Sequence, residues 1–255
     1  MIDAHLALYR PGRQDAVLTP DVGRDMIEAY RAATAALQAE FGSAGFMITF
    51  AVNWQPDHDA IGEPDSIADA GCAVHIFGRR AGEMISPVRA MTLQRSRRRP
   101  PAPDPKLGDR LRPLLADPPA TVIVEPPPGE LCDGCAGSVL TDQERWRGGG
   151  VRVIRPRRVL IDPHVLVLPV RHVASLRDLE PDEVTSLSAR LVESLRQFRL
   201  GSGSTGLSGF ANDGVAARQE TPHVHLHVYG RSVGEPVNPY QRLAAYLPPG
   251  AQRPV

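Results

Sequence analysis

The sequence predicts a protein of mixed strands and helices, built from two similar halves in tandem. Residues 75–87 (HIFGRRAGEMISP) align without a gap with residues 227–239 (HVYGRSVGEPVNP), sharing His, Gly, Arg, Gly, Glu and Pro. Fainter agreement pairs residues 5–11 with residues 164–170. Each half then reads as strand, helix, strand, strand, and we expect both halves to share one architecture.

The helix of each half is predicted from the spacing of its apolar residues. Residues 18–21 (LTPD) and 179–182 (LEPD) precede the two stretches, and each ends on an aspartate where a helix N-terminus favours an anion. The apolar positions recur close to every 3.6 residues, which is typical of a helix packed on one face. They are Ile27, Tyr30, Leu37 and Phe41 in the first half, and Val184, Leu187, Leu191, Leu195 and Phe198 in the second.

A segment rich in proline and arginine separates the halves. Residues 95–120 (RSRRRPPAPDPKLGDRLRPLLADPPA) read as an irregular linker or an exposed arm. Their arginine run is either a solvated stretch or a contact for phosphate. We therefore expect a first unit over residues 1–92, a linker over 93–120 and a second unit over 121–255.

The composition of the chain argues against several classes of protein. The 255 residues carry 29 basic and 29 acidic side chains, so no net field draws the protein to nucleic acid or to an anionic membrane. No stretch approaches the roughly 20 apolar residues of a membrane span, and the N-terminus lacks the pattern of a signal peptide. An odd number of cysteines, three, argues against a disulfide framework. We expect a soluble cytoplasmic protein with no nucleic-acid or membrane partner.

Three histidines alternate within residues 221–231 (TPHVHLHVYGR): His223, His225 and His227. Alternate residues of a strand share one face, so we expect the three imidazoles on one side and apolar residues on a buried side. At about 3.3 Å per residue, the outer two lie roughly 13 Å apart, too far for one ion to bind all three. At least one of them must have another task.

The pair Cys132 and Cys135, in ELCDGCAG, has the C-x-x-C spacing of many structural zinc sites. Zinc needs about four ligands, and His172 and His223 are plausible third and fourth ligands. A redox dithiol or two unrelated cysteines are the alternatives, although no thioredoxin-like pattern follows. The sequence therefore predicts a structural zinc.

His225, free of the metal, is the candidate nucleophile. Neutral imidazole attacks phosphorus well near pH 7, and a covalent intermediate divides one difficult displacement into two easier steps. The preceding loop, residues 210–222, offers Asn212 and Gln219 as contacts for a phosphate or a leaving group. Asn212, Asp213 and Gly214 could equally form only a turn.

Residues from about 122 to 240 resemble a histidine triad (HIT) domain. The matching stretches are CDGC, HVLVLPVRHVASLRDLEPDE and NDGVAARQETPHVHLHVYGR, in the order and spacing of that family. The resemblance implies an α+β fold with an antiparallel sheet and a helix, two copies of which pair into one larger sheet. It also implies a nucleotide hydrolase or transferase acting on phosphoramidates, dinucleoside polyphosphates or sugar phosphates.

The resemblance further implies roles for individual residues. His225 becomes the nucleotidylated nucleophile, His227 supports the site and Asn212 contacts the phosphate region. Zinc-bearing bacterial members and the related galactose-phosphate uridylyltransferases hold a structural zinc with two cysteines and two histidines. That set maps onto Cys132, Cys135, His172 and His223.

Only the second half retains these residues. At the positions that match His223 and His225 the first half has Gly71 and Ala73, and of the three histidines it keeps only His75. We expect a degenerate first HIT-like unit, so that one chain imitates the family's dimer and holds one active site. The protein would be a monomer, as such a pseudo-dimer, or a homodimer.

Two departures from the family pattern concern substrate recognition. Arg218 and Glu220 stand where the family usually has a small residue and a serine, and a carboxylate there repels phosphate unless it is protonated, paired or turned away. Before HVLVLP, where the family has a ribose-binding acidic residue, this chain has three arginines and a displaced Asp162. The arginines are Arg155, Arg157 and Arg158.

We therefore expect an enzyme that hydrolyses nucleotide phosphoramidates or dinucleotides through a nucleotidyl-histidine intermediate. His227 favours hydrolysis, because the transferases of the wider superfamily usually have glutamine at that place. The repeat and Glu220 favour a nucleotidyltransferase of specialised metabolism instead. A third possibility is a non-catalytic sensor module in which Glu220 abolishes turnover.

Overall fold

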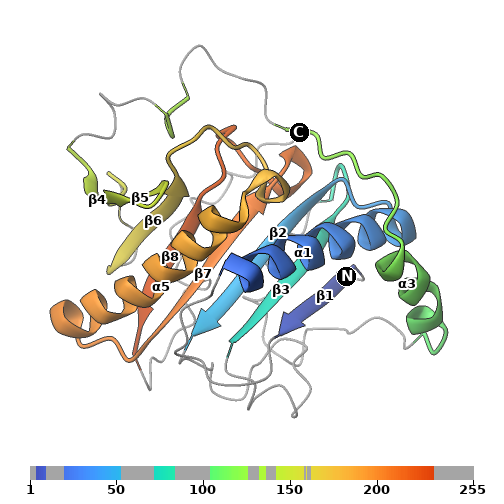
Figure 1. The fold of residues 1–255 in the computed structure, drawn as a ribbon, viewed down its shortest axis with the longest axis horizontal. Helices are drawn as coiled ribbons and strands as arrows, with labels where there is room; N and C mark the ends of the chain where they lie inside the picture. Colours follow the sequence, from blue (N-terminus) through green and yellow to red (C-terminus); the bar gives the residue numbers. More distant parts are fainter. Residues whose placement is uncertain are drawn as a thin grey trace.

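The computed structural model shows a sheet covered on one face by helices (Figure 1). The residues that it describes are 4–9, 20–52, 72–83, 104–125, 132–135, 142–157, 159 and 162–232. The later parts of the matching segments of the repeat, residues 84–87 and 233–239, and the position Gly71 lie outside the described residues.

The two halves contain the same elements in the same order. The first consists of β1 (His5–Tyr9), α1 (Pro20–Phe41), β2 (Gly45–Val52) and β3 (Cys72–Arg79). The second consists of β6 (His164–Pro169), α5 (Pro181–Ser202), β7 (Gly206–Asp213) and β8 (Leu226–Arg231). The predicted order of strand, helix, strand, strand is confirmed in each half.

The other described elements lie between the halves or in the loops of the second half. They are α3 (Leu107–Ala116), β4 (Glu144–Gly148), β5 (Val151–Ile154) and the short 3-10 helices η2 (Leu176–Asp178) and η3 (Val215–Ala217).

The halves meet through β2 and β7 in one antiparallel sheet. Within the described residues its order is β1-β3-β2-β7-β8-β6-β5-β4, so the order of the first half is reversed in the second. The register between β2 and β7 is centred on the pair Thr49 and Phe210. The fold is of the α+β class, as predicted, and β5 and β4 extend the sheet beyond β6.

Each helix covers a core on its own half of the sheet. Beneath α5 the buried residues include Val167, Leu187, Leu195, Phe198, Leu207, Val224 and Val228. Beneath α1 they include Tyr30, Ala33, Leu37, Phe46, Ile48 and Ile76. The predicted apolar faces of both helices are thus the buried ones, because their spacing places them in one stripe.

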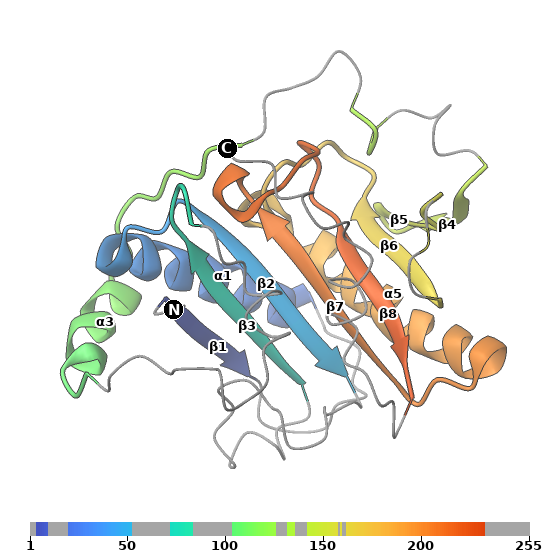
Figure 2. The same cartoon turned by 180° about the vertical axis from the view of Figure 1, so that it is seen from behind.

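Figure 2 shows the sheet from the side opposite to the helices. Paired histidines occupy matching positions of the two halves on that face of the sheet. In the second half, Val228 belongs to the core under α5, so its neighbour His227 projects from the other side of β8. Its Nδ1 lies 3.1 Å from Nε2 of His164. In the first half Nδ1 of His75 lies 2.9 Å from Nε2 of His5.

The segment between the halves is partly helical, which contradicts the prediction of an irregular linker or arm. Residues 107–116 form α3, which packs beside α1 through the buried Leu111. Arg110 of α3 donates hydrogen bonds to Glu40 of α1 and to Asp104, both at 2.7 Å. The proline and arginine content masked the apolar spacing of this short helix.

Of the helices that the structure describes, none has the length and apolar character required to span a bilayer.

We predict that Gly209→Ala destabilises the centre of the sheet. A Cβ there would lie 2.3 Å from the carbonyl oxygen of His227 and 2.3 Å from Cζ of Phe50. Overpacking of this kind typically costs about 1–3 kcal/mol of unfolding free energy, measurable by urea denaturation.

Gly201→Ala is the matched control. This glycine lies in α5, and a Cβ added there would meet no neighbouring atom within 4 Å, so its replacement should leave stability unchanged or raise it by up to about 1 kcal/mol. Equal stability of the two variants would show that the sheet centre is not as tight as described.

Candidate functional site

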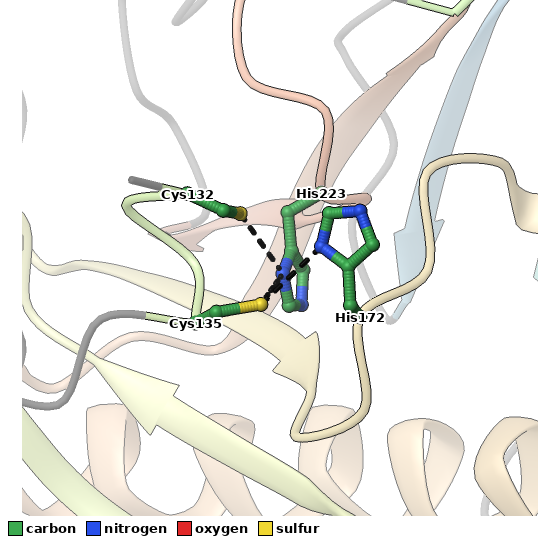
Figure 3. Close-up of side chains that lie close together, drawn as sticks. All are labelled: Cys132, Cys135, His172 and His223. Carbon is green, nitrogen blue, oxygen red and sulfur yellow. Dashed lines mark hydrogen bonds between the residues drawn. The ribbon is translucent and has the colours of Figure 1, made fainter. Parts of the chain in front are cut away.

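Two cysteines and two histidines from three segments meet beside the second half of the sheet (Figure 3). Their ligand atoms all lie within 4.8 Å of one another. The Sγ of Cys135 is 3.3 Å from Nδ1 of both His172 and His223, and the Sγ of Cys132 is 3.5 Å from Nδ1 of His223. The structure thus brings together the four residues that the sequence predicted as metal ligands.

His223 is held ready to bind a metal through Nδ1. Its ring is fully buried, and Nε2 donates a hydrogen bond to the carbonyl of Pro169 over 2.9 Å. That bond fixes the tautomer with the Nδ1 lone pair toward the cysteines. Burial is the main cause that lowers the pKa of His223 to about 4, so the ring is neutral near pH 7.

The cysteines are presented by a tight turn against this ring. The amide of Cys135 donates to the carbonyl of Cys132 over 2.8 Å, and Gly134 lies directly on the imidazole of His223. A Cβ at residue 134 would be 2.3 Å from Cγ of that ring. Two thiols and two imidazoles that converge at this spacing are a donor set compatible with zinc.

His225 is not one of the four clustered ligand residues, and its ring has a defined tautomer. Its Nδ1 donates a hydrogen bond over 2.9 Å to the backbone carbonyl of His223, which leaves the lone pair of Nε2 unused by that bond. Burial lowers the pKa of His225, and the His223 carbonyl and the charge of Glu220 oppose this shift. The ring is half-buried beside that of His227, with 5.0 Å between ring centroids.

His227 belongs to a stack of rings on the same face. Its ring lies 4.4 Å from that of Phe210 and its Nδ1 shares a hydrogen bond with Nε2 of His164. Burial is the main cause that lowers the pKa of His164 to about 4. The sequence aligned His164 with His5 but gave it no role, although the paired histidines of the repeat were a usable signal.

The three alternating histidines do not all lie in one strand, which corrects the prediction. Strand β8 begins at Leu226, and residues 221–225 precede it as bends and coil. The ring of His223 leaves the row because it turns into the cysteine cluster, while the amide of Val224 donates to the carbonyl of Val173. The apolar alternation itself is confirmed, because Val224 and Val228 are fully buried.

The loop after β7 is anchored by buried polar groups. Gln219 accepts a hydrogen bond from the amide of Gly214 and donates one to the carbonyl of Ala174, both at 2.7 Å. Asp213 is fully buried and accepts from Tyr30, Ser175 and the amide of Leu176. The sequence read Asp213 only as part of a possible turn and missed its contact with the first half.

The remaining predicted substrate contacts lie around this loop. Asn212 is half-buried in β7, where its backbone pairs with Met47. Arg218 is exposed in the left-handed region with φ 65°, and Glu220 is exposed with its charge felt by His225. Of the arginines before β6, Arg155 forms an ion pair with Asp162 and Arg157 one with Asp142, whereas Arg158 lies outside the described residues.

Comparison with curated proteins gives relatives that match roughly three tenths of this chain. The asymmetrical bis(5'-nucleosyl)-tetraphosphatase of Schizosaccharomyces pombe is 40% identical over 76 residues, 28% of this chain and 40% of the relative. The bifunctional bis(5'-adenosyl)-triphosphatase/adenylylsulfatase FHIT of Arabidopsis thaliana is 35% identical over 81 residues, 31% of this chain and 43% of the relative. The chain spans about half the length of the curated relatives that it matches.

A solved structure is similar over most of the chain. An ADP-glucose phosphorylase from Arabidopsis thaliana, crystallised with ADP-glucose, superimposes with a TM-score of 0.54 at 10% identity. The match covers 90% of this chain and 64% of that one, which shows a shared fold.

The family model described as the HIT domain matches residues 151–233. This range contains β5 to β8, α5, His172 and all three alternating histidines. Residues 151–233 therefore form a HIT domain.

Proposed function

We propose that the protein hydrolyses nucleotide phosphoramidates or dinucleotides through a nucleotidyl intermediate on His225. The observation that carries the proposal is the hydrogen bond from Nδ1 of His225 to the carbonyl of His223. It fixes the ring so that the Nε2 lone pair is available for attack. The similarity to a bis(5'-nucleosyl)-tetraphosphatase supports a phosphorus centre in a nucleotide as the target.

The reaction then has two displacements. Nε2 of His225 attacks the nucleotidyl phosphorus, a P–N bond forms, and the bond to the leaving amine or phosphate breaks as that group takes up a proton. Water attacks the same phosphorus in the second step, the P–N bond breaks, and a nucleoside monophosphate leaves with His225 restored. His227 would support the ring of His225 from the adjacent stack.

Zinc is the metal that we propose for the four-residue cluster, with Cys132, Cys135, His172 and His223 as ligands. When bound, it supplies structural rigidity and no chemistry at phosphorus. Because the backbone of His223 accepts the bond from His225, whatever fixes His223 also aims the nucleophile. The thiols need a reducing compartment, which the cytoplasm provides.

Four side chains are proposed to bind or orient the substrate. Asn212 and Arg218 offer an amide and a cation for the phosphate region, and Glu220 sets the charge next to His225. Both polar groups of Gln219 bind the backbone, so its part is to shape the loop that carries the others. A carboxylate at Glu220 disfavours a highly charged leaving group and favours an amine.

We also propose that residues 1–92 form a degenerate unit, residues 93–120 the linker and residues 121–255 the working HIT domain. The matching elements and the mirrored pairs His5–His75 and His164–His227 support this internal duplication. One chain would then replace the dimer of single-domain relatives and hold one active site.

Nucleotidyl transfer is the second candidate function. The observation in its favour is the fold shared with an ADP-glucose phosphorylase over 90% of the chain. In that case an acceptor other than water, such as phosphate or a sugar phosphate, would take the nucleotidyl group from His225. Product analysis with and without added acceptor distinguishes the two reactions.

We predict that His225→Ala removes the covalent intermediate. Wild-type protein mixed with adenosine phosphoramidate or a dinucleotide should show a nucleotidyl adduct by intact mass spectrometry. The variant should show none, and turnover should fall by roughly three orders of magnitude or more because the nucleophile is lost.

His75→Asn, at the position that mirrors His227, is the control and should retain the adduct. Tight nucleotide binding by the wild type with neither adduct nor product would refute the enzyme and support a sensor module.

We predict about one zinc ion per chain, measured by elemental mass spectrometry, and its loss in Cys132→Ser. Gly134→Ala should also lose zinc because its Cβ collides with the ring of His223. Gly108→Ala, with open space around residue 108, should keep the metal. Full zinc content in Gly134→Ala would contradict the described approach of the turn to His223.

A further inference from the structure

A side chain of the first half reaches the base of the candidate active-site loop in the second. The hydroxyl of Tyr30, on α1, donates to Oδ2 of Asp213 over 2.7 Å, and both side chains are buried. Asp213 is the last residue of β7 and directly precedes residues 214–222, which lead to His223 and His225. The contact therefore joins the helix of one half to the loop of the other.

Asp213 fastens this loop to the segment that carries His172. The same oxygen Oδ2 accepts from Oγ of Ser175 at 3.1 Å and from the amide of Leu176 at 3.2 Å. Further along, Gln219 donates to the carbonyl of Ala174. The loop before His223 and the segment after His172 are thus held together, with Asp213 at their base.

The Asp213 carboxylate depends on these few donors. Its Oδ1 has no hydrogen-bond partner among the described residues, so all of its bonds fall on Oδ2. Burial raises the pKa of Asp213 to about 6, while the bonds from Tyr30, Ser175 and Leu176 act in the opposite direction. A buried carboxylate that loses one of three donors is poorly satisfied and shifts or protonates.

Among the described residues, the link has no counterpart in the other half of the sheet. Helices α1 and α5 both have 22 residues, and counting from Pro20 and Pro181 places Leu191 at the position of Tyr30. Strands β2 and β7 both have 8 residues, which places Val52 at the position of Asp213. A leucine and a valine cannot form this hydrogen bond. The first half therefore contacts the end of β7 in the half with the three histidines, and in the part of the chain that the structure describes no equivalent contact joins α5 to the end of β2.

We propose that Tyr30 is a positioning residue for the reaction at His225, acting through Asp213 and residues 214–222. The first half then contributes a specific contact to the active site of the second, as well as a supporting surface. This inference rests on the proposed function only for its kinetic consequence. Its structural part, the ordering of residues 214–219 by the Tyr30 hydroxyl, stands independently of turnover.

The test compares Tyr30→Phe with Thr34→Val in the full-length, zinc-loaded protein. Tyr30→Phe keeps the ring in the core and removes only the hydroxyl. Thr34→Val removes another buried hydroxyl one turn further along α1, whose bonds stay within the helix, to Tyr30 and Arg31. Amide hydrogen exchange of residues 214–219 and steady-state kinetics with adenosine phosphoramidate are measured for both.

In Tyr30→Phe we expect exchange of residues 214–219 to accelerate about tenfold or more, because a bond to a charged group is lost. We expect kcat to fall by a similar factor with KM nearly unchanged, since the substrate still binds but the loop is misplaced. Thr34→Val should match the wild type in both. Ser175→Ala, which removes a second donor to the same oxygen, should reproduce the effect of Tyr30→Phe.

Unchanged exchange of residues 214–219 in Tyr30→Phe would overturn the proposal, whatever the result in Ser175→Ala. Equal acceleration in Thr34→Val would also overturn it, because the effect would then be a general loosening of α1. If no variant or wild type turns over substrate, the proposed function fails, and the exchange result alone decides whether Tyr30 orders the loop.

Discussion

The imidazole of His223 is the point at which the metal cluster, the sheet and the candidate nucleophile are joined. Its Nδ1 faces the two cysteines, and its Nε2 donates a hydrogen bond to the carbonyl of Pro169 at the end of β6. Its own backbone carbonyl accepts a hydrogen bond from Nδ1 of His225. Any movement of this residue changes all three contacts at once. A structural metal bound at this place would therefore be linked to the orientation of the His225 lone pair that we propose as the nucleophile.

The first half can form its part of the sheet without the three alternating histidines because the sheet depends on backbone pairing and on the two cores. The register between β2 and β7 and the cores beneath α1 and α5 require apolar residues at the right spacing, and they require no histidine. The first half keeps these features together with the pair His5 and His75. It also contacts the second half through the hydrogen bond from Tyr30 to Asp213. Strand β2 of the first half ends on a valine where β7 ends on this aspartate.

Acidic side chains near His225 give this site a different charge from the usual pattern of the family, which has a serine at position 220. Glu220 lies near enough for its charge to raise the pKa of His225 against the effect of burial, and Asp213 places a second acidic group beneath the loop. An anionic loop attracts cationic or amine-bearing groups more readily than polyphosphates. The cation of Arg218, exposed on the same loop, offsets part of that charge. In the proposed reaction, the acidic residue at position 220 therefore bears on the identity of the leaving group more than on the attack itself.

The sequence by itself determined the order of strand, helix, strand, strand in both halves, the buried stripes of α1 and α5, and the residue types of the metal cluster. The spacing of apolar residues and the match between the two segments are properties of the sequence alone, so they can be recognised without a structure. Only the tertiary structure decided that Cys132, Cys135, His172 and His223 converge, that β8 begins at Leu226, and that residues 107–116 are helical. The contact between Tyr30 and Asp213 spans 183 positions of the chain, and no spacing rule connects residues so far apart. Contacts of that kind arise from how two packed layers meet, which is a property of the folded chain as a whole.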